Sequence, residues 1–523
     1  MRTPRLLALP FLVLALAACK KAPAPERFIA GDTAMAVVVP SLASFAAQGA
    51  DVLDTAATFP GGQNVNDLRA VVESRLGFDL FDTESLARAG FDPKRGAAIG
   101  FRMDEGGQPE MIAALPAGNG KQLTETLDAL AKDRLQLPAR TVEGDVVKWG
   151  PEGGPALLAY AIEEKTAVVA SGATALELVQ AARKVPKDGH LGTKPDYKAA
   201  LQAAGAGQAV VWYFSSQGPM FEVPQLASMR EMFKRGLALG LSGAKDRVAF
   251  TMGMPLDDAS PFAKMGKADA SPLVARLDPN SNWVARSDTD AATTFELQRP
   301  MLRNLLESMG APDEFRKAVD GAFGAISGGT ALSVSVVPVE GGAPSIREAP
   351  LAFFRLELLV GIKDAARTKE AIRALVKEGP KRPPGEELDL SGDGPWTFPA
   401  AGGEVGVAVE DAQLLLVAGP KGSLKALGAR SGTTFEPPTA TATQAFRGSM
   451  GGMYIDVPKL AGALKVIPAA AFGDDPQGTV LHANVQKVAS VLSRFTAVSV
   501  SADVKDETYR GALVIEVAPP PAK

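Results

Sequence analysis

The chain has 523 residues, of which 46% are hydrophobic, and its formal net charge at pH 7 is −4. This length predicts more than one domain, and the slight excess of acidic groups argues against nucleic acid as a partner. Cys19 is the single cysteine, which excludes an internal disulfide, and no apolar run of eighteen residues follows it, so no transmembrane helix is predicted in the remaining chain.

The first residues have the pattern of an export signal. Arg2 and Arg5 precede an apolar stretch at residues 6–16 that is too short to span a bilayer, and small residues follow it. The segment 16–19, Leu-Ala-Ala-Cys, resembles the lipobox of bacterial lipoproteins. The resemblance implies that residues 1–18 are a lipoprotein signal peptide, removed on export.

The same resemblance implies how the chain is attached to a membrane. Cys19 receives a diacylglyceryl thioether and, on its new amine, an acyl chain such as palmitate. More than one chain gives a stable anchor, since each buried methylene contributes about 0.8 kcal/mol. Lys20 in place of aspartate is the sorting signal for the outer membrane in enteric bacteria. Residues 19–26, which are rich in lysine and proline, are expected to form a short stiff tether.

An internal repeat is the main feature of the remaining sequence. Residues 157–179 align without gaps on 405–427 at an offset of 248. Both segments have the pattern of a strand, a tight turn, a second strand and a helix, with acidic turns at 163–165 and 410–411. Further matches follow in the same order: residues 32–36 with 280–284 at offset 248, Trp149 with Trp396 at 247, and Leu127 and Leu130 with Ile372 and Leu375 at 245.

Each copy is expected to end in a helix followed by a strand pair. The helical spacing lies at Leu226, Met229, Phe233 and Leu237 in the first copy and at Leu481, Val485, Val488 and Leu492 in the second. Turns are predicted at 243–246 and at 505–507. We therefore predict two tandem homologous α+β domains, each a mainly antiparallel sheet with packed helices, related by a pseudo-twofold axis.

The domain boundaries follow from the repeat and from composition. We expect the first domain at residues 27–255 and the second at residues 273–518. Between them, residues 256–272 lack periodicity and are rich in small and helix-breaking residues, which is typical of a linker. Residues 519–523 are a proline-rich tail.

Two further segments carry a family resemblance. They are residues 30–34, Ala-Gly-Asp-Thr-Ala, and residues 86–93, Leu-Ala-Arg-Ala-Gly-Phe-Asp-Pro. Together with the lipobox they resemble functionally uncharacterised bacterial envelope lipoproteins with a duplicated α+β domain. The resemblance implies a strand that opens on Asp-Thr and a Gly-Phe-Asp-Pro turn before the next strand, and it implies no known activity.

Side chains of the kinds used in catalysis are few and scattered. His190 and His482 are the two histidines and stand in different parts of the two copies, which argues against a histidine-based zinc site or triad. Lys121 follows a Gly-Asn-Gly segment, but an ordinary strand-to-helix turn is favoured over a phosphate loop. We predict no catalytic, cofactor-binding or metal-binding residues.

Two repeated features are candidate sites. The acidic pairs Glu163-Glu164 and Glu410-Asp411 favour solvated turns over a metal or glycosidase site. The matched Trp149 and Trp396 favour a core role, with ligand contact as the alternative.

Function is expected to lie in binding. The leading interpretation is a non-catalytic, lipid-anchored envelope protein that acts as an interaction or scaffolding module for an envelope protein partner. Its contacts are expected on the loops at 338–350 and 379–395, which distinguish the second copy from the first. The alternative is a carrier or sensor for an apolar envelope ligand bound within one repeat. A carboxylate- or Ser/Lys-dependent hydrolase is the second alternative.

Overall fold

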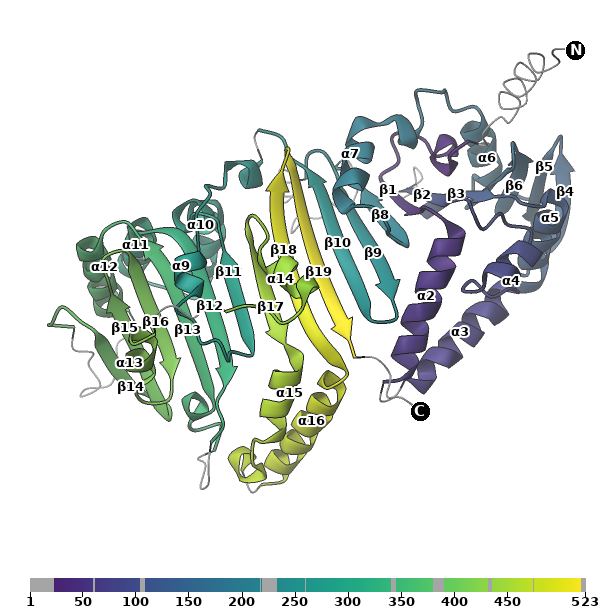
Figure 1. Ribbon diagram of the computed structural model, residues 1–523. Coiled ribbons are helices and arrows are strands. Elements are labelled where there is room, and N and C mark those ends of the chain that lie inside the picture. The colour runs from purple at the N-terminus through teal and green to yellow at the C-terminus, as the bar shows by residue number, and fades with distance from the viewer. Residues whose placement is uncertain are drawn as a thin grey trace, which may run out of the picture.

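The protein is an α+β structure built on one large antiparallel sheet, which confirms the expected fold class (Figure 1). The computed structural model describes residues 23–59, 62–103, 109–216, 218, 233–258, 260–339, 345–379, 390–430, 435–473 and 475–518. Within these residues the sheet has 19 strands.

The first half of the chain supplies ten strands: β1 Met35–Val39, β2 Ala97–Met103, β3 Pro109–Pro116, β4 Ala139–Glu143, β5 Val146–Gly150, β6 Leu158–Glu163, β7 Thr166–Ser171, β8 Val210–Phe214, β9 Leu237–Ala244 and β10 Arg247–Pro255. The second half supplies the rest: β11 Trp283–Ser287, β12 Ile326–Val336, β13 Phe354–Ile362, β14 Trp396–Ala400, β15 Gly403–Val409, β16 Gln413–Gly419, β17 Gly451–Asp456, β18 Phe495–Lys505 and β19 Thr508–Val517.

The helices of the first half are η1 Pro25–Phe28, α2 Leu42–Ala57, α3 Gln63–Leu76, α4 Thr83–Arg88, α5 Gly120–Ala129, the π-helical η2 Leu130–Arg134, α6 Ala175–Arg183, η3 Leu191–Thr193 and α7 Pro195–Ala204. The later helices are η5 Pro261–Lys264, α9 Ser271–Val274, α10 Ala291–Ser308, α11 Asp313–Ala325, η6 Pro350–Ala352, α12 Ala365–Glu378, α13 Ser423–Gly428, α14 Ala440–Phe446, α15 Val457–Lys465, η7 Ala469–Phe472 and α16 Pro476–Leu492.

Strand pairing is continuous across the sheet. Outward from β10 the order is β9, β8, β1, β2, β3, β7, β6, β5 and β4. Outward from β19 it is β18, β17, β11, β12, β13, β16, β15 and β14. At the centre β10 pairs with β19, from Arg247 opposite Glu516 to Pro255 opposite Thr508, where the teal and yellow strands meet in Figure 1. This pairing joins both halves of the chain into one sheet.

Helices pack on both faces of the sheet. In the first half, α2, α4 and α5 bury Leu42, Leu86 and Leu123 on one face, while α6 and α7 bury Leu178 and Tyr197 on the other. In the second half, α9, α13 and α14 pack on one apolar cluster, and α10 and α12 border another. Because alternate side chains of a strand point to opposite faces, each half contains two apolar layers separated by the sheet.

The acidic turns predicted at 163–165 and 505–507 are two-residue hairpin turns. Glu164 and Lys165 have φ of 46° and 66°, and Asp506 and Glu507 have φ of 49° and 55°. Positive φ at both central residues matches the turn to the right-handed twist of the flanking strands. Both hairpins and the helix ending at Leu492 therefore confirm the sequence prediction.

The hairpin register corrects the offset of 248 between 157–179 and 405–427. Ile162 pairs with Ala167 in the first hairpin, and Val409 pairs with Leu414 in the second. These pairs lie 247 positions apart, the same interval that separates the two tryptophans. A shift of one residue moves every side chain to the other face of a strand, so the gapless sequence match assigned the wrong faces.

The prediction of a helix through Phe233 and Leu237 is also wrong for these two residues, which the structure describes. Phe233 lies in a turn and Leu237 begins β9, whereas Leu226 and Met229 lie outside the described residues. Leu237, Leu239 and Leu241 pair with β8, so tertiary pairing decides this segment against its helical spacing.

The segment predicted as a linker, 256–272, contains η5 and the start of α9, and Leu256 in it is buried. The signal peptide with Cys19, and the tail 519–523, lie outside the described residues, as do 340–344 and 380–389 in the two loops. Among the helices of the described residues, none is long and apolar enough to cross a membrane.

Candidate functional site

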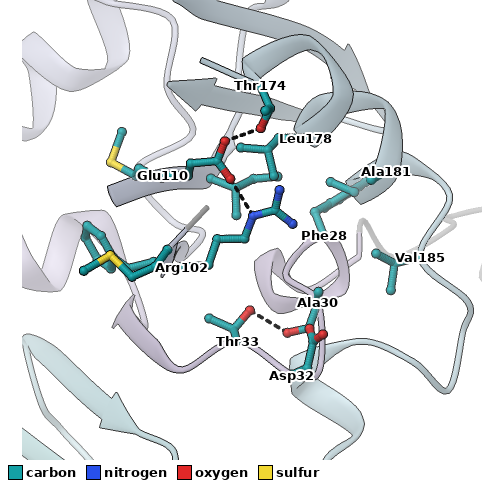
Figure 2. A pocket seen from close by; sticks show the side chains of 16 residues that line it. Phe28, Ala30, Asp32, Thr33, Arg102, Glu110, Thr174, Leu178, Ala181 and Val185 are labelled. Atoms are coloured by element: carbon teal, nitrogen blue, oxygen red, sulfur yellow. Dashed lines mark hydrogen bonds and ion pairs between the residues drawn. The ribbon is translucent and has the colours of Figure 1, made fainter. Parts of the chain in front are cut away.

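A pocket of about 650 Å³ opens beside α6 in the first half of the chain (Figure 2). Its walls come from η1 and the segment that follows it, from β2 and β3, and from α6. We call it the α6 pocket. Its size lies within the range of small-molecule sites, which is roughly 300–1,000 Å³.

One wall of the α6 pocket is apolar. Phe28 of η1 and Leu178 and Ala182 of α6 are each 4% exposed, and Val185 extends the same wall beyond the helix. Close packing behind the wall is possible because Gly100 has no side chain, since a Cβ there would lie 2.9 Å from Ile29 Cγ2. The wall can therefore accept an apolar group while the core behind it stays filled.

A second wall carries a buried carboxylate. Glu110 of β3 is 1% exposed, and its Oε2 accepts a hydrogen bond of 2.8 Å from Nε of Arg102, the residue directly across from it on β2. The hydroxyl of Thr174, just before α6, donates to the other carboxylate oxygen. Both oxygens of Glu110 therefore have a partner, as a buried charge requires.

The rim of the pocket is polar. Asp32 is exposed there, and the buried Thr33 donates from its hydroxyl to the carbonyl oxygen of Ala30 at 2.7 Å, which holds the chain between η1 and β1 in place. The α6 pocket is thus amphipathic, with an apolar wall, one guanidinium and a polar entrance.

The second half has a different set of residues at the matching strand positions. In the first half β3 lies between β2 and β7, and its Ile112 is paired with Gly100 and Ala170. In the second half β13 lies between β12 and β16, and its Glu357 is paired with Ser333 and Val417, which makes Glu357 the counterpart of Ile112. Two residues earlier, β3 has Glu110 and β13 has Arg355.

These second-half positions belong to a buried ionic cluster, formed by Asp278, Arg355, Glu357 and Arg430. Glu357 is completely buried and accepts from Arg430 Nη1 at 2.8 Å on both carboxylate oxygens. Arg355 forms ion pairs with Asp278 and Glu357. Burial is the main influence on the Arg355 guanidinium and lowers its pKa, although Glu357 opposes that shift.

The two tryptophans predicted as possible ligand contacts are buried and hydrogen-bonded. Trp149 Nε1 donates to Asp128 at 2.9 Å, and Trp396 Nε1 donates to the carbonyl oxygen of Gly392 at 3.2 Å. Arg373 lies over the Trp396 ring, 5.7 Å from its centroid. Neither tryptophan lines the α6 pocket.

The other candidate residues do not line the α6 pocket. The backbone of His190 forms an isolated antiparallel β-bridge with Ala30. The ring of His482 forms a hydrogen bond with Gln486 within α16. Lys121 lies in the first turn of α5. The side chain of Asn119 caps this helix by accepting hydrogen bonds from the backbone N–H groups of Lys121 and Gln122.

One acidic residue at each of the two hairpin turns is paired with an arginine. Glu163 accepts from Arg183 at 2.8 Å, and Glu410 forms an ion pair with Arg276. Within the described residues, no group of three or more His, Cys, Asp and Glu side chains is placed to hold a metal ion.

Sequence reasoning missed Arg102 and Glu110. A signal was present, because Glu110 alternates with Ile112 and Ala114, which are apolar residues of the same strand. A charged residue in phase with a buried face indicates a paired or functional group. Its partners could not be read from this pattern, since Thr174 lies 64 positions further along the chain.

Comparison with known proteins gives limited matches. No protein-family model and no curated protein matches the chain. Among solved structures it is similar to two crystal forms of TP0453, a Treponema envelope protein. Crystal form IV has 11% identity and a TM-score of 0.26 and covers 46% of this chain and 83% of TP0453. Crystal form III has 11% identity and a TM-score of 0.25 and covers 47% of this chain and 86% of TP0453. Likeness at these scores carries no conclusion about function.

Proposed function

We propose that the protein is a lipid-anchored envelope protein that binds a small amphipathic ligand in the α6 pocket, as a carrier or sensor and without turnover. The observation that carries this proposal is the difference between the halves. At matching strand positions the first half has Ile112 and a pocket, while the second half has the buried ionic cluster around Glu357. The second half has other pockets, of about 400 and 520 Å³, but at the position that matches the α6 pocket it has ionic side chains instead. A pocket present at one of two matching positions is consistent with a dedicated binding site.

The absence of turnover is part of the proposal. Glu110 is the buried carboxylate of the pocket, and both of its oxygens accept hydrogen bonds, from Arg102 and Thr174. A general base directs an oxygen at the substrate, whereas Arg102 and Thr174 hold both oxygens of Glu110 toward donors of the protein itself. Glu110 is therefore better suited to hold Arg102 in position than to take a proton.

The duplication of the chain belongs to the same proposal. We assign residues 27–255 and 273–518 to two homologous domains, joined through 256–272. The support is the identical order of matching strands outward from β10 and from β19, with β4 as an additional edge strand. The antiparallel pairing of β10 with β19 is compatible with a pseudo-twofold axis between the halves.

The lipid anchor is proposed on the sequence of residues 1–19, with the outer membrane as the location. Phe28 in the pocket wall is nine residues after Cys19. An extended chain spans at most about 3.3–3.6 Å per residue, so the pocket wall would lie within about 30 Å of an acylated Cys19. Such a position would allow the pocket to receive ligands from the bilayer.

An interaction module is the second candidate function. Figure 1 shows α15 and α16 side by side and projecting beyond the strands. Val466, at the end of α15, is 63% exposed, and Val480 and Val488 of α16 are more than half exposed. Apolar side chains gathered on a projecting helix pair are typical of a protein–protein contact.

The test uses the full acylated chain in phosphatidylcholine nanodiscs and an uncharged probe, a long-chain alcohol with a photoactivatable diazirine. We expect the probe to label peptides that contain Phe28 or Leu178. Ala181→Trp should reduce this labelling at least tenfold, because Ala181 is an exposed residue of α6 that lines the pocket. Ala426→Trp is the matched control, since Ala426 is an exposed alanine of α13. Equal labelling of both variants would refute the binding site.

A further inference from the structure

The orientation of Arg102 defines what the α6 pocket can hold. Its Nε donates a hydrogen bond to Glu110. Among the described residues, Glu110 is the ion-pair partner of Arg102. Figure 2 shows the remaining nitrogens of the guanidinium directed into the pocket, toward Leu178 and Phe28. A guanidinium has five N–H donors and no acceptor, so the two terminal nitrogens offer donors to a bound group.

The fixed position of Arg102 follows from Glu110. Because Glu110 is buried and its second oxygen accepts from Thr174, it cannot rotate freely to follow another cation. Arg102 itself is 54% exposed, so its terminal nitrogens can be reached from solvent. The pair therefore presents a preoriented donor edge at the boundary between the pocket interior and water.

Charge then selects the head group. A cationic head would meet the guanidinium of Arg102 and would find both oxygens of Glu110 already engaged. An oxyanion fits, because the parallel N–H groups of a guanidinium match the two oxygens of a carboxylate or phosphate. Asp32 on the exposed rim repels negative charge, so it favours a head group with one negative charge over a head group with two.

The apolar wall selects the remainder of the ligand. Phe28, Leu178 and Ala182 continue from the guanidinium and offer carbon atoms alone to a bound molecule. A chain of methylenes that lies along this wall removes apolar surface from water on both sides.

We propose that the α6 pocket takes an acyl chain with a terminal oxyanion, a carboxylate or a phosphate monoester, whose head binds the terminal nitrogens of Arg102 and whose chain lies along Phe28 and Leu178. This inference rests on the proposed function and specifies its ligand class. The two head groups correspond to two envelope sources, free fatty acids and lysophosphatidic acids.

The experiment compares diazirine-labelled hexadecanoate, an acyl lysophosphatidic acid, hexadecanol and hexadecylamine on the full acylated chain in phosphatidylcholine nanodiscs. Half-saturating concentrations for labelling of the Phe28 and Leu178 peptides are measured. One oxyanion probe at least should saturate about tenfold below the alcohol and the amine, as expected for a charge-assisted bidentate contact. The lower of the two oxyanion values identifies the source.

Two variants test the role of Arg102. The double variant Arg102→Gln with Glu110→Gln removes both charges together, so no unpaired buried charge remains and the fold is preserved. It should remove the tenfold preference and leave hexadecanol labelling unchanged. Arg88→Gln, at an arginine with a 70% exposed side chain, is the control and should keep the preference.

The outcomes separate this inference from the function on which it rests. Equal saturation by alcohol and oxyanions, or a preference that persists in the double variant, would overturn the ligand class while the binding site stands. Tighter labelling by the amine would do the same. If none of the four probes labels these peptides, and Ala181→Trp changes nothing, both proposals fail.

Discussion

The ionic cluster of the second half predicts a large stability difference between two glutamates. We expect Glu357→Ala to lower the free energy of unfolding by about 3–5 kcal/mol, the cost of removing one partner from a buried ion pair. Glu357 is fully buried and is contacted by Arg355 and Arg430, whose side chains are each 20% exposed. Its loss would leave Asp278 as the one carboxylate of the cluster for two largely buried guanidinium groups.

Two further contacts add to this cost. The hydroxyl of Ser333 donates to Glu357 Oε2 at 3.0 Å, and the backbone N–H of Asp278 donates to the same oxygen at 3.2 Å. Each unsatisfied buried donor costs about 1–3 kcal/mol when its partner is removed without replacement. Glu357→Gln keeps an acceptor for these donors, so its destabilisation should be smaller than that of Glu357→Ala.

Glu436→Ala is the matched control. Glu436 also pairs with an arginine, Arg447, but both side chains are more than 60% exposed, at 66% and 63%. Exposed ion pairs contribute about 0–1 kcal/mol, so this variant should unfold almost like the unchanged protein. Denaturant unfolding followed by circular dichroism measures both. A loss below about 1 kcal/mol for Glu357→Ala, or equal losses for the two variants, would refute the view that the cluster stabilises the second half.

Two other predictions concern pH and the membrane. Burial acts to raise the pKa of Asp79, but hydrogen bonds from Arg69 and from the backbone of Phe81 outweigh it, so the pKa lies below its usual value. The stabilisation is therefore present above about pH 4 and is lost as the pH falls through the lowered pKa. The melting-temperature difference between the unchanged protein and Asp79→Asn should shrink below pH 4; a constant difference down to pH 2 would contradict this. Cys19→Ala should release a folded protein from membranes, measured by detergent-phase partitioning, and retention after a salt wash would indicate a second anchor.

Local elements were predictable where a turn or a helix is specified by its own residues. The acidic turn at Glu164 and Lys165 and the helix that ends at Leu492 depend on neighbouring residues, so their patterns suffice. Leu237 shows the limit of such patterns. Its spacing suited a helix, but hydrogen bonding to β8 and β10 places it in a strand.

The candidate site could be predicted much less. The tryptophans Trp149 and Trp396 repeat in the sequence, which suggests ligand contact, yet the structure buries both within their own halves. Arg102 and Glu110 do not repeat, because the second half has Ser335 and Arg355 at the same pair of positions. A search for repeated residues cannot find a site that lies in one half of the chain alone.

By itself, the sequence determined the α+β class, the hairpins and the single cysteine after an apolar N-terminal stretch, because each depends on composition or on residues close together in the chain. The tertiary structure decided the continuous sheet through β10 and β19 and the pairing of Glu110 with Arg102 and Thr174. These contacts join segments from different parts of the chain, and their register and burial are fixed when the strands pair and the helices cover them.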